Sequence, residues 1–249
     1  MTQRTSNCPN CGAPVVFRWS SSVQTVCPYC KSVLVRTDVD LKKVGQVADL
    51  PPDASPLQIT SEGQYANRAF VVSGRIIYEY EQGNWNEWHI VFNDGSDGWI
   101  SDAQDEYAIS FRKDVSGLPA QPAAKLGKDF QWDGVTFTVT SLTLAHYAGV
   151  EGELPFEYWD KTDVTFVDLR SHGGDFATLD YSDEQPVLYT GKAVDFEDLQ
   201  LKNVRKFEEE QAFQDQKHQA LSRLADGISG QLQLELSVVS DESTRGGET

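Results

Sequence analysis

Apolar and polar residues alternate most clearly in residues 84–101, and this pattern predicts a β-hairpin. An Asp-Gly pair separates the two alternating runs, and Gly supplies the positive φ that a tight hairpin turn requires. The predicted parts are a strand with Trp88, Ile90 and Phe92 on one face, a turn at Asn93-Asp94-Gly95 and a return strand at Trp99-Ile100. We expect the first β unit of the chain to be built around this hairpin.

A second hairpin of the same kind is predicted further along the chain. Its parts are Val164, Phe166 and Asp168 on the first strand, a turn at Gly173-Gly174 and a return strand at Phe176–Leu179. The pairs that align the two copies are Tyr65 with Trp132, Phe70 with Phe137, Phe92 with Phe166, and Trp99 with Phe176. They indicate an internal duplication with a period of about 70 residues. The period widens at 148–161, where we predict an acidic loop containing Gly and Pro.

The fold predicted for the whole chain is mainly β. We expect an N-terminal zinc ribbon, then two related antiparallel β units formed by bent sheets or small barrels, and one C-terminal amphipathic helix. The predicted boundaries are ribbon 1–40, linker 41–56, first β unit 57–115, linker 116–124, second β unit 125–205, and a C-terminal helix, short strand and disordered tail in 206–249. Prolines define both linkers, since Pro is excluded from central strands and helix interiors.

All four cysteines lie near the N-terminus, in two Cys-x2-Cys pairs. The pairs are Cys8 with Cys11 and Cys27 with Cys30, and this spacing is typical of a zinc ribbon. A redox dithiol would have a single pair beside a βαβ pattern, and disulfides would accompany an export signal. We therefore predict one structural Zn²⁺. Four thiolate ligands would leave no open position for catalysis.

The formal net charge of −17 argues against a nucleic-acid binder, because affinity for phosphate depends on cations. Residues 1–43 are an exception, with six Lys/Arg against two Asp. A weaker hypothesis is therefore that the ribbon contacts nucleic acid through Arg18, Lys31 and Arg36. No apolar run long enough for a signal peptide or a membrane span is visible, so we expect a cytoplasmic protein that reaches a membrane only through a partner.

A search for catalytic patterns finds one weak candidate, the pair Glu87 and His89. Residues two apart on a strand share a face, so this pair could act as general acid and base if it lined a cleft. The ordinary alternative is the polar face of a half-exposed hairpin. Neither a phosphate-binding Gly loop nor a nucleophile elbow is present. We predict no catalytic residue and expect that the protein is not an enzyme.

The tryptophans suggest a second kind of site. Most of them should pack in the core, but an exposed aromatic patch ringed by acidic residues would suit a protein partner. The residues considered for an interaction surface or a pocket are Trp85, Glu87, Trp88, His89 and Trp99.

Three stretches together give the chain a family resemblance. They are the Cys-Pro-x-Cys ribbon, the Trp85-Asn-Glu-Trp88 hairpin that ends in Asp-Gly-Trp99, and Phe176–Tyr181 with Leu188-Tyr189-x-Gly191. Residues 57–205 resemble the bacterial domain of unknown function 4178 family. The resemblance implies a β-rich bacterial protein of unestablished activity. It also implies an accessory role, because relatives are encoded near membrane-associated stress or scaffold proteins.

Three functional hypotheses emerge. The first is a non-catalytic adaptor that binds an unidentified protein partner, in a membrane-linked or stress-related complex. The second is a small-ligand-binding or enzymatic β barrel that uses the Glu87/His89 region. The third is nucleic-acid contact by the ribbon. A flat apolar patch would favour the first hypothesis, and a concave site at Glu87 would favour the second.

Overall fold

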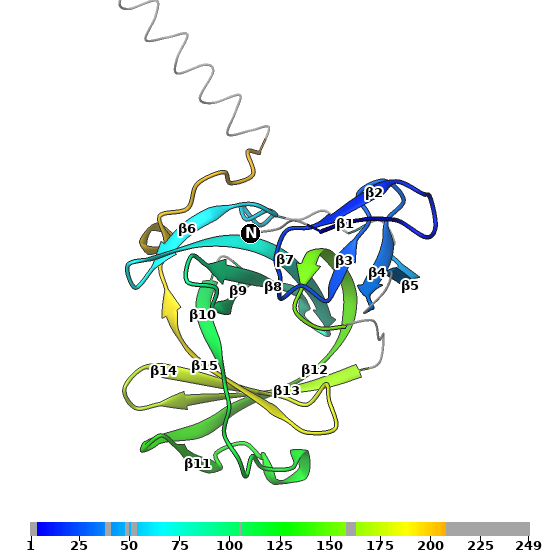
Figure 1. Cartoon of the computed structure of the whole chain (residues 1–249). Coiled ribbons are helices and arrows are strands. Elements are labelled where there is room, and N and C mark those ends of the chain that lie inside the picture. The colour runs from blue at the N-terminus through cyan, green and yellow to red at the C-terminus, as the bar shows by residue number, and fades with distance from the viewer. Residues whose placement is uncertain are drawn as a thin grey trace, which may run out of the picture. The chain divides into compact units, whose positions relative to one another are not determined.

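The computed structural model describes residues 4–37, 41–47, 50, 54–104, 106–157 and 163–207 (Figure 1). The chain divides into two compact units, Met1–Val204 and Arg205–Thr249. All strands of the described residues belong to the first unit. The predicted C-terminal helix, short strand and tail lie outside the described residues, and so does Trp159.

The described part of the chain is mainly β, as predicted. Its N-terminal strands are β1 (Arg4–Asn7), β2 (Pro14–Phe17), β3 (Gln24–Val26), β4 (Ser32–Arg36) and β5 (Leu41–Gln46). The later strands are β6 (Glu62–Tyr65), β7 (Arg68–Tyr80), β8 (Gly83–Phe92), β9 (Asp97–Ala103), β10 (Glu106–Lys113), β11 (Asp129–Trp132), β12 (Val135–Leu154), β13 (Asp163–Ser171), β14 (Asp175–Asp180) and β15 (Val187–Val194). Two 3₁₀ helices are η1 (Gln121–Ala123) and η2 (Phe196–Leu199).

The N-terminal strands β1 to β5 form the ribbon. Strand β1 pairs with β2, while β4 pairs with both β3 and β5. Strand β5 lies in the stretch predicted as the first part of a linker, so the ribbon continues to Gln46. Leu41 is buried against Leu34 and the cysteines, which fixes this strand on the ribbon. The prolines that defined the linker begin at residue 51 and do not interrupt β5.

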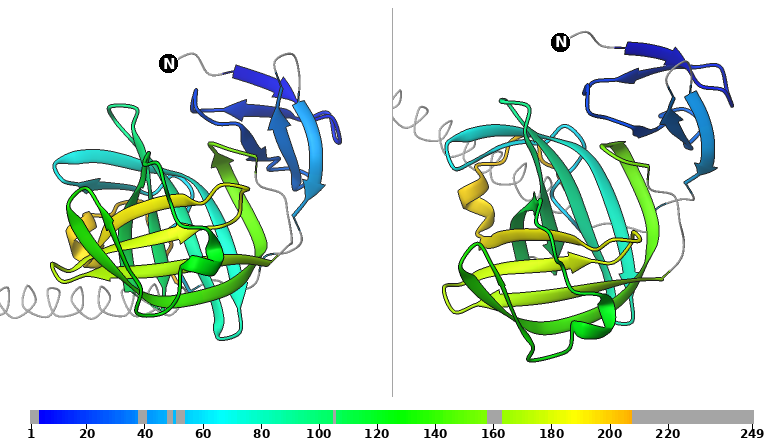
Figure 2. Two further views of the ribbon diagram at one scale, coloured as in Figure 1. Left: turned by 90° about the horizontal axis from the view of Figure 1, so that it is seen from below. Right: turned by 60° about the horizontal axis from the view of Figure 1, so that its bottom comes forward.

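Eight antiparallel strands close into one barrel (Figures 1 and 2). The order is β7-β8-β9-β10-β15-β14-β13-β12, and β12 pairs with β7 to close the ring. The two predicted β units are therefore the two halves of one closed sheet. Local alternation predicts strands but not which edges meet, and the pairings β10–β15 and β7–β12 join the halves. Closure leaves none of these eight strands as an open edge.

The duplication is visible in the strand registers. In the first half Phe70 faces Phe92, and in the second half Phe137 faces Ser171. Both halves have a register shift at the same place, before Gly74 in β7 and before Ser141 in β12. Along β7 and β12 the offset between equivalent residues is 67 (137 − 70), and from β8 and β13 onward it is 79 (171 − 92).

These registers test the four aligned pairs. Phe70 with Phe137 fits the offset of 67, and Tyr65 with Trp132 (132 − 65) fits it as well. The other two aligned pairs are wrong, because Phe92 corresponds to Ser171 and Trp99 to Thr178. Aromatic positions do not correspond across this part of the chain, because the connection between the first two strands differs in length between the halves.

The halves are related by an approximate two-fold axis. Tyr78 faces Tyr147, and the equivalent pair Ala145 faces Tyr80. At the other join Ser110 faces Gly191, and the equivalent pair Tyr189 faces Arg112. Exchange of the two halves therefore superimposes the pairing β7–β12 on itself and the pairing β10–β15 on itself, as a two-fold axis requires.

The change of offset corresponds to twelve extra residues (79 − 67) between β12 and β13. Most of these residues extend β12, so the predicted loop 148–161 begins as a strand that continues to Leu154. Glycine is common in loops, but the glycines here permit close approach of a strand to its neighbours, since a Cβ on Gly149 would overlap the side chain of Leu50.

The extended end of β12 also carries the ribbon (Figure 2). Glu153 faces Thr25 of β3, and its carboxylate accepts hydrogen bonds from the backbone N–H groups of Arg18 and Trp19 and from Ser22 Oγ. A buried carboxylate with several donors is well satisfied. The ribbon is therefore attached to the barrel through the inserted residues.

Candidate functional site

The four cysteines converge in the ribbon as predicted. Their sulfur atoms all lie within 4.8 Å of one another, and all four thiols are free. Cys8 Sγ lies 3.7 Å from Cys30 Sγ, and Cys11 Sγ lies 3.8 Å from Cys27 Sγ. A tetrahedron with metal–sulfur bonds of about 2.3 Å has sulfur–sulfur edges of about 3.8 Å. The cluster has the dimensions to hold a metal ion, and four thiolates would enclose that ion completely.

A second candidate site is a cavity inside the barrel. Its empty volume is about 480 Å³, and the centre of a water molecule can occupy about 60 Å³ of it. The lining residues are Ile76, Tyr78, Glu87, Trp99, Ser101, Ser110, Phe156, Phe166, Phe176, Thr178, Asp180 and Tyr189. They come from seven of the eight barrel strands and from the residues after β12, which places the cavity between opposite walls.

The two-fold relation explains how polar groups reach this cavity. Glu87 of β8 faces Ser101 of β9, and the equivalent pair in the second half is Phe166 facing Asp180. Each half thus supplies one carboxyl group to the cavity. In the first half it comes from the second strand, β8, and in the second half it comes from the third strand, β14. Ser110 and Tyr189 are equivalent to each other, and both line the cavity.

The carboxyl groups of the cavity are held in a poorly hydrated setting. Burial raises the pKa of Glu87 to about 7, although Ser101 and Trp85 both donate hydrogen bonds to its carboxylate. Burial also raises the pKa of Asp180 and of Tyr189. Groups with shifted pKa values in a concave site are typical of binding or catalytic sites.

The predicted site residues fall into two groups. Glu87 and Trp99 line the cavity, and Trp85 lies beside it, stacked on Tyr78. Glu87 lies inside the barrel, so this face of the hairpin points into the cavity. It is not the half-exposed polar face that the alternative interpretation of the sequence predicts.

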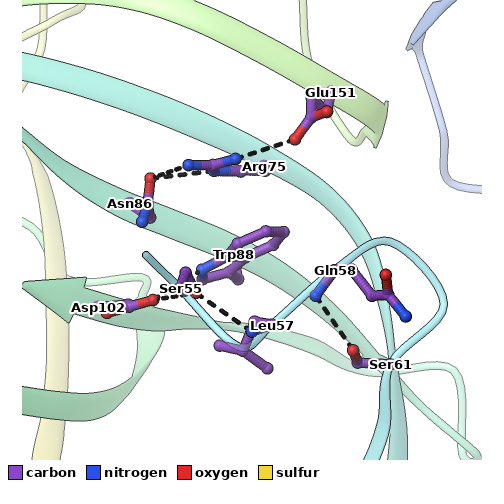
Figure 3. Close-up of polar contacts among 9 residues, drawn as sticks. All are labelled: Ser55, Leu57, Gln58, Ser61, Arg75, Asn86, Trp88, Asp102 and Glu151. Carbon is purple, nitrogen blue, oxygen red and sulfur yellow. Dashed lines mark hydrogen bonds and ion pairs between the residues drawn. The ribbon is translucent and has the colours of Figure 1, made fainter. Parts of the chain in front are cut away.

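Trp88 points to the outer side of the barrel wall (Figure 3). It is 0% exposed, and its Nε1 donates to Asp102, which also accepts a hydrogen bond from Ser55. Arg75 covers the indole ring and bonds Asn86 and Glu151. Trp88 therefore anchors the segment before β6 onto the barrel and offers no surface to a partner.

His89 does not join Glu87 in a catalytic pair. Its Nδ1 lies 2.6 Å from Ser73 Oγ, and its Nε2 lies 3.0 Å from the carboxylate of Asp97. This serine, histidine and aspartate lie in a row, but Ser73 is only 3% exposed and also contacts the backbone carbonyl of His89. A nucleophile must reach its substrate. We interpret the row as a structural link across the register shift of β7.

Several cavity residues were missed in the sequence, above all Asp180, Tyr189 and Phe156. Asp180 and Tyr189 are two-fold equivalents of Ser101 and Ser110, so in the correct alignment of the halves Asp180 takes the position of Ser101, the residue that faces Glu87. Phe156, which stacks on Trp99, follows the extension of β12 and has no equivalent in the first half.

A family model described as "Domain of unknown function (DUF4178)" matches residues 58–196, which span the barrel. The chain belongs to the DUF4178 family. The ribbon lies outside the matched residues. No curated protein and no solved structure gives a significant match to this DUF4178 chain. Among the described residues, none of the helices has the length and apolar character that crossing a membrane demands.

Proposed function

We propose that this DUF4178 chain binds a small molecule inside its barrel, without catalysis, and that the ribbon is a zinc-stabilised module attached to the barrel wall. The cavity around Glu87 is the observation that supports ligand binding. Eight-stranded barrels are of a size that can enclose one small ligand. Several of the lining side chains remain partly exposed, which is consistent with access from solvent; they are Glu87, Ser101, Phe156, Thr178, Asp180 and Tyr189.

Zinc is the metal that we propose for the ribbon, because tetrahedral four-thiolate sites are typical of structural Zn²⁺. The cysteines would hold the ion, and the ion would supply cross-linking in place of a large core. Among the described residues, the buried cluster around the cysteines consists of Val15, Phe17, Leu34 and Leu41 besides two of the cysteines. Small modules of this kind depend on their metal for folding.

Ligand-observed NMR with mixtures of small neutral, anionic and cationic compounds tests the binding function. The full-length, metal-loaded chain is compared with Ser110→Tyr, which puts into the first half the aromatic residue that the second half has at Tyr189. Ser116→Tyr, at an exposed bend away from the cavity lining, is the control. We expect compounds that bind the wild type and the control and lose binding in Ser110→Tyr. Equal binding to folded Ser110→Tyr, or no binding at all, would contradict the proposal.

A second candidate function is the adaptor, with a protein partner in a membrane-linked or stress-related complex. The favouring observation is Leu142 and Leu144 on the outer face of β12, which are 44% and 60% exposed. Their equivalents in the first half, Arg75 and Ile77, are buried. Exposed neighbouring leucines suit an apolar contact.

The adaptor is tested by affinity capture from the native host with the wild type, Leu142→Asp/Leu144→Asp and Cys27→Ser/Cys30→Ser. A partner that only the leucine variant loses would place the contact on β12. A partner that only the cysteine variant loses would place it on the ribbon. A partner that both folded variants retain would argue against either surface.

A further inference from the structure

We propose that the barrel cavity selects a small primary ammonium ion, a cation with N–H donors on a short apolar chain. This inference rests on the proposed ligand-binding function and adds the chemical class of the ligand. It is drawn from the charge, the aromatic rings, the hydrogen-bond acceptors and the size of the cavity.

The charge of the lining is one-sided. Two of the cavity residues are carboxylic acids, Glu87 and Asp180, and none of the described lining residues is Lys, Arg or His. Asp168, the two-fold equivalent of His89, lies close enough to act on the charge of Glu87. A cavity with walls of low dielectric and charges of one sign concentrates ions of the opposite sign. An anionic ligand would meet repulsion from each of these carboxyl groups that is ionised.

Aromatic rings surround the carboxyl groups. The rings that line the cavity belong to Tyr78, Trp99, Phe156, Phe166, Phe176 and Tyr189. Several of them pack on one another, since Tyr78 meets Phe166 edge-on at 4.9 Å and Trp99 stacks on Phe156 at 5.8 Å. The faces of such rings attract cations within about 6 Å. A cage that combines rings with carboxylates favours an organic cation over a neutral apolar ligand.

The acceptors favour a primary ammonium over a quaternary one. Glu87 accepts hydrogen bonds from Ser101 Oγ and Trp85 Nε1, and each oxygen of an ionised carboxylate can accept more than one. Ser110 and Thr178 also line this space, and the Thr178 hydroxyl, which donates to Asp168, keeps its oxygen lone pairs as acceptors. Charge-assisted hydrogen bonds to N–H donors are roughly twice as strong as neutral ones, and a quaternary ammonium has none to give.

The size of the cavity limits the ligand. A single water molecule requires about 10–15 Å³ of space for its centre. The 60 Å³ available here therefore fits roughly four to six groups of that size. A short alkylammonium fills such a space, whereas a nucleotide or a peptide does not.

Binding should be linked to the protonation of Glu87. Ser101 and Trp85 donate hydrogen bonds to Glu87 and lower its pKa, while the carboxyl groups of Asp168 and Asp180 raise it. Tyr189 lines the same cavity. The positive charge of Arg112 on β10 acts to lower the pKa of Tyr189. A bound cation stabilises the ionised carboxylate, so it should lower the pKa of Glu87 from about 7. Affinity should therefore rise as the pH increases from 5 to about 7 and then level off.

Isothermal titration of the full-length, metal-loaded chain with butylammonium tests the inference. The comparison probes are 1-butanol, which has the same shape without the charge, and tetramethylammonium, which has the charge without N–H donors. We expect butylammonium to bind at least about tenfold more tightly than either, a difference of about 1.4 kcal/mol. Glu87→Gln should weaken butylammonium about tenfold and reduce the pH dependence to the part that Asp180 contributes, while Glu184→Gln in an exposed turn should change neither.

The other outcomes separate this inference from the proposed function. If 1-butanol binds as tightly as butylammonium and Ser110→Tyr blocks both, the cavity binds ligands but the ammonium class is wrong. If tetramethylammonium binds as tightly as butylammonium, the cage selects cations without N–H donors and the primary class is overturned. If no probe binds, and the wider mixtures give no ligand either, the proposed function itself fails.

Discussion

The two halves of the barrel share their strand order, their register shift and their joins, yet they differ in what they present. The half formed by β7 to β10 places Glu87 opposite Ser101, and the half formed by β12 to β15 places Phe166 opposite Asp180. The acidic residue thus lies on the second strand of the first half and on the third strand of the second half. The duplication therefore fixes where side chains meet in the cavity, and the residue at each position is free to differ.

The halves also differ in the length of the connection between their first two strands. In the first half a tight turn after Tyr80 connects β7 to β8, whereas the second half has twelve extra residues there (79 − 67). That extension holds the ribbon through Glu153 and leads to Phe156 in the cavity. The insertion in the second half therefore carries the ribbon and also contributes a residue to the cavity.

Removal of the metal should have the largest effect, and that effect should be confined to the ribbon and to its attachment at Glu153. Structural zinc contributes about 10–16 kcal/mol of apparent binding free energy to small modules, while the barrel has its own buried clusters. With a chelator we expect amide hydrogen exchange to lose protection in residues 4–46 and at Glu153, and to stay unchanged in β8 and β9.

Cys27→Ser/Cys30→Ser should give the same exchange pattern without the chelator. Loss of protection throughout β7 to β10 after metal removal would show that the two parts do not fold independently. Full protection of the ribbon in the cysteine variant would show that the metal is dispensable for its folding.

The equivalent positions Gly74 and Ser141 should respond very differently to alanine. A Cβ on Gly74 would overlap the backbone oxygen of Glu153, so Gly74→Ala must displace the extension of β12. We expect a loss of about 3 kcal/mol or more in the free energy of unfolding. Ser141→Ala removes one hydrogen bond of 2.8 Å to Asp168 and should cost about 1 kcal/mol.

Urea denaturation followed by circular dichroism measures both variants. Equal losses at the two positions would mean that the extension of β12 does not distinguish the halves. A near-neutral Gly74→Ala would mean that the backbone there can shift to accept a methyl group.

The dependence of stability on pH should show a smaller effect than Gly74→Ala. The pKa of Glu87 is raised from 4.5 to about 7, so the folded state binds the proton more tightly than the unfolded state. The resulting stabilisation is fully present below pH 4.5 and is lost as the pH rises to about 7, by at most about 3 kcal/mol. Glu87→Gln should flatten this decline and be the more stable protein at pH 8.

Asp180→Asn is the matched variant in the other half, and it should flatten the decline as well, because burial also raises the pKa of Asp180. The measurement is the urea midpoint at pH 4.5 and pH 8 for each variant. A wild-type slope in Glu87→Gln would show that Glu87 is not the group that titrates.

Features that depend on neighbours in the sequence could be predicted. The cysteine spacing led to the cluster, and the alternation led to the hairpin β8–β9, in which Trp88, Ile90 and Phe92 do share one packed face. The turn at Gly95 has the positive φ that its sequence implied, at 86°.

Features that depend on distant partners could not be predicted. The pairings β7–β12 and β10–β15 decide that the body is one barrel, and both join strands far apart in the sequence. The interior position of Glu87 follows from that closure, and so does its shared cavity with Asp180. Glycines at 149 and 152 looked like loop residues because their role is to let strands approach, which only the folded backbone reveals.

The two-fold symmetry of the pairings β7–β12 and β10–β15 has an evolutionary consequence. Because Glu79 with His146 and Phe111 with Thr190 are equivalent positions facing each other, a chain of one half could pair with a copy of itself along the same edges. Such a homodimer would necessarily carry identical residues on both sides of its cavity. Fusion of two gene copies removes that constraint, and it allows one copy to gain Glu87 while the other gains Asp180 and the insertion that carries the ribbon.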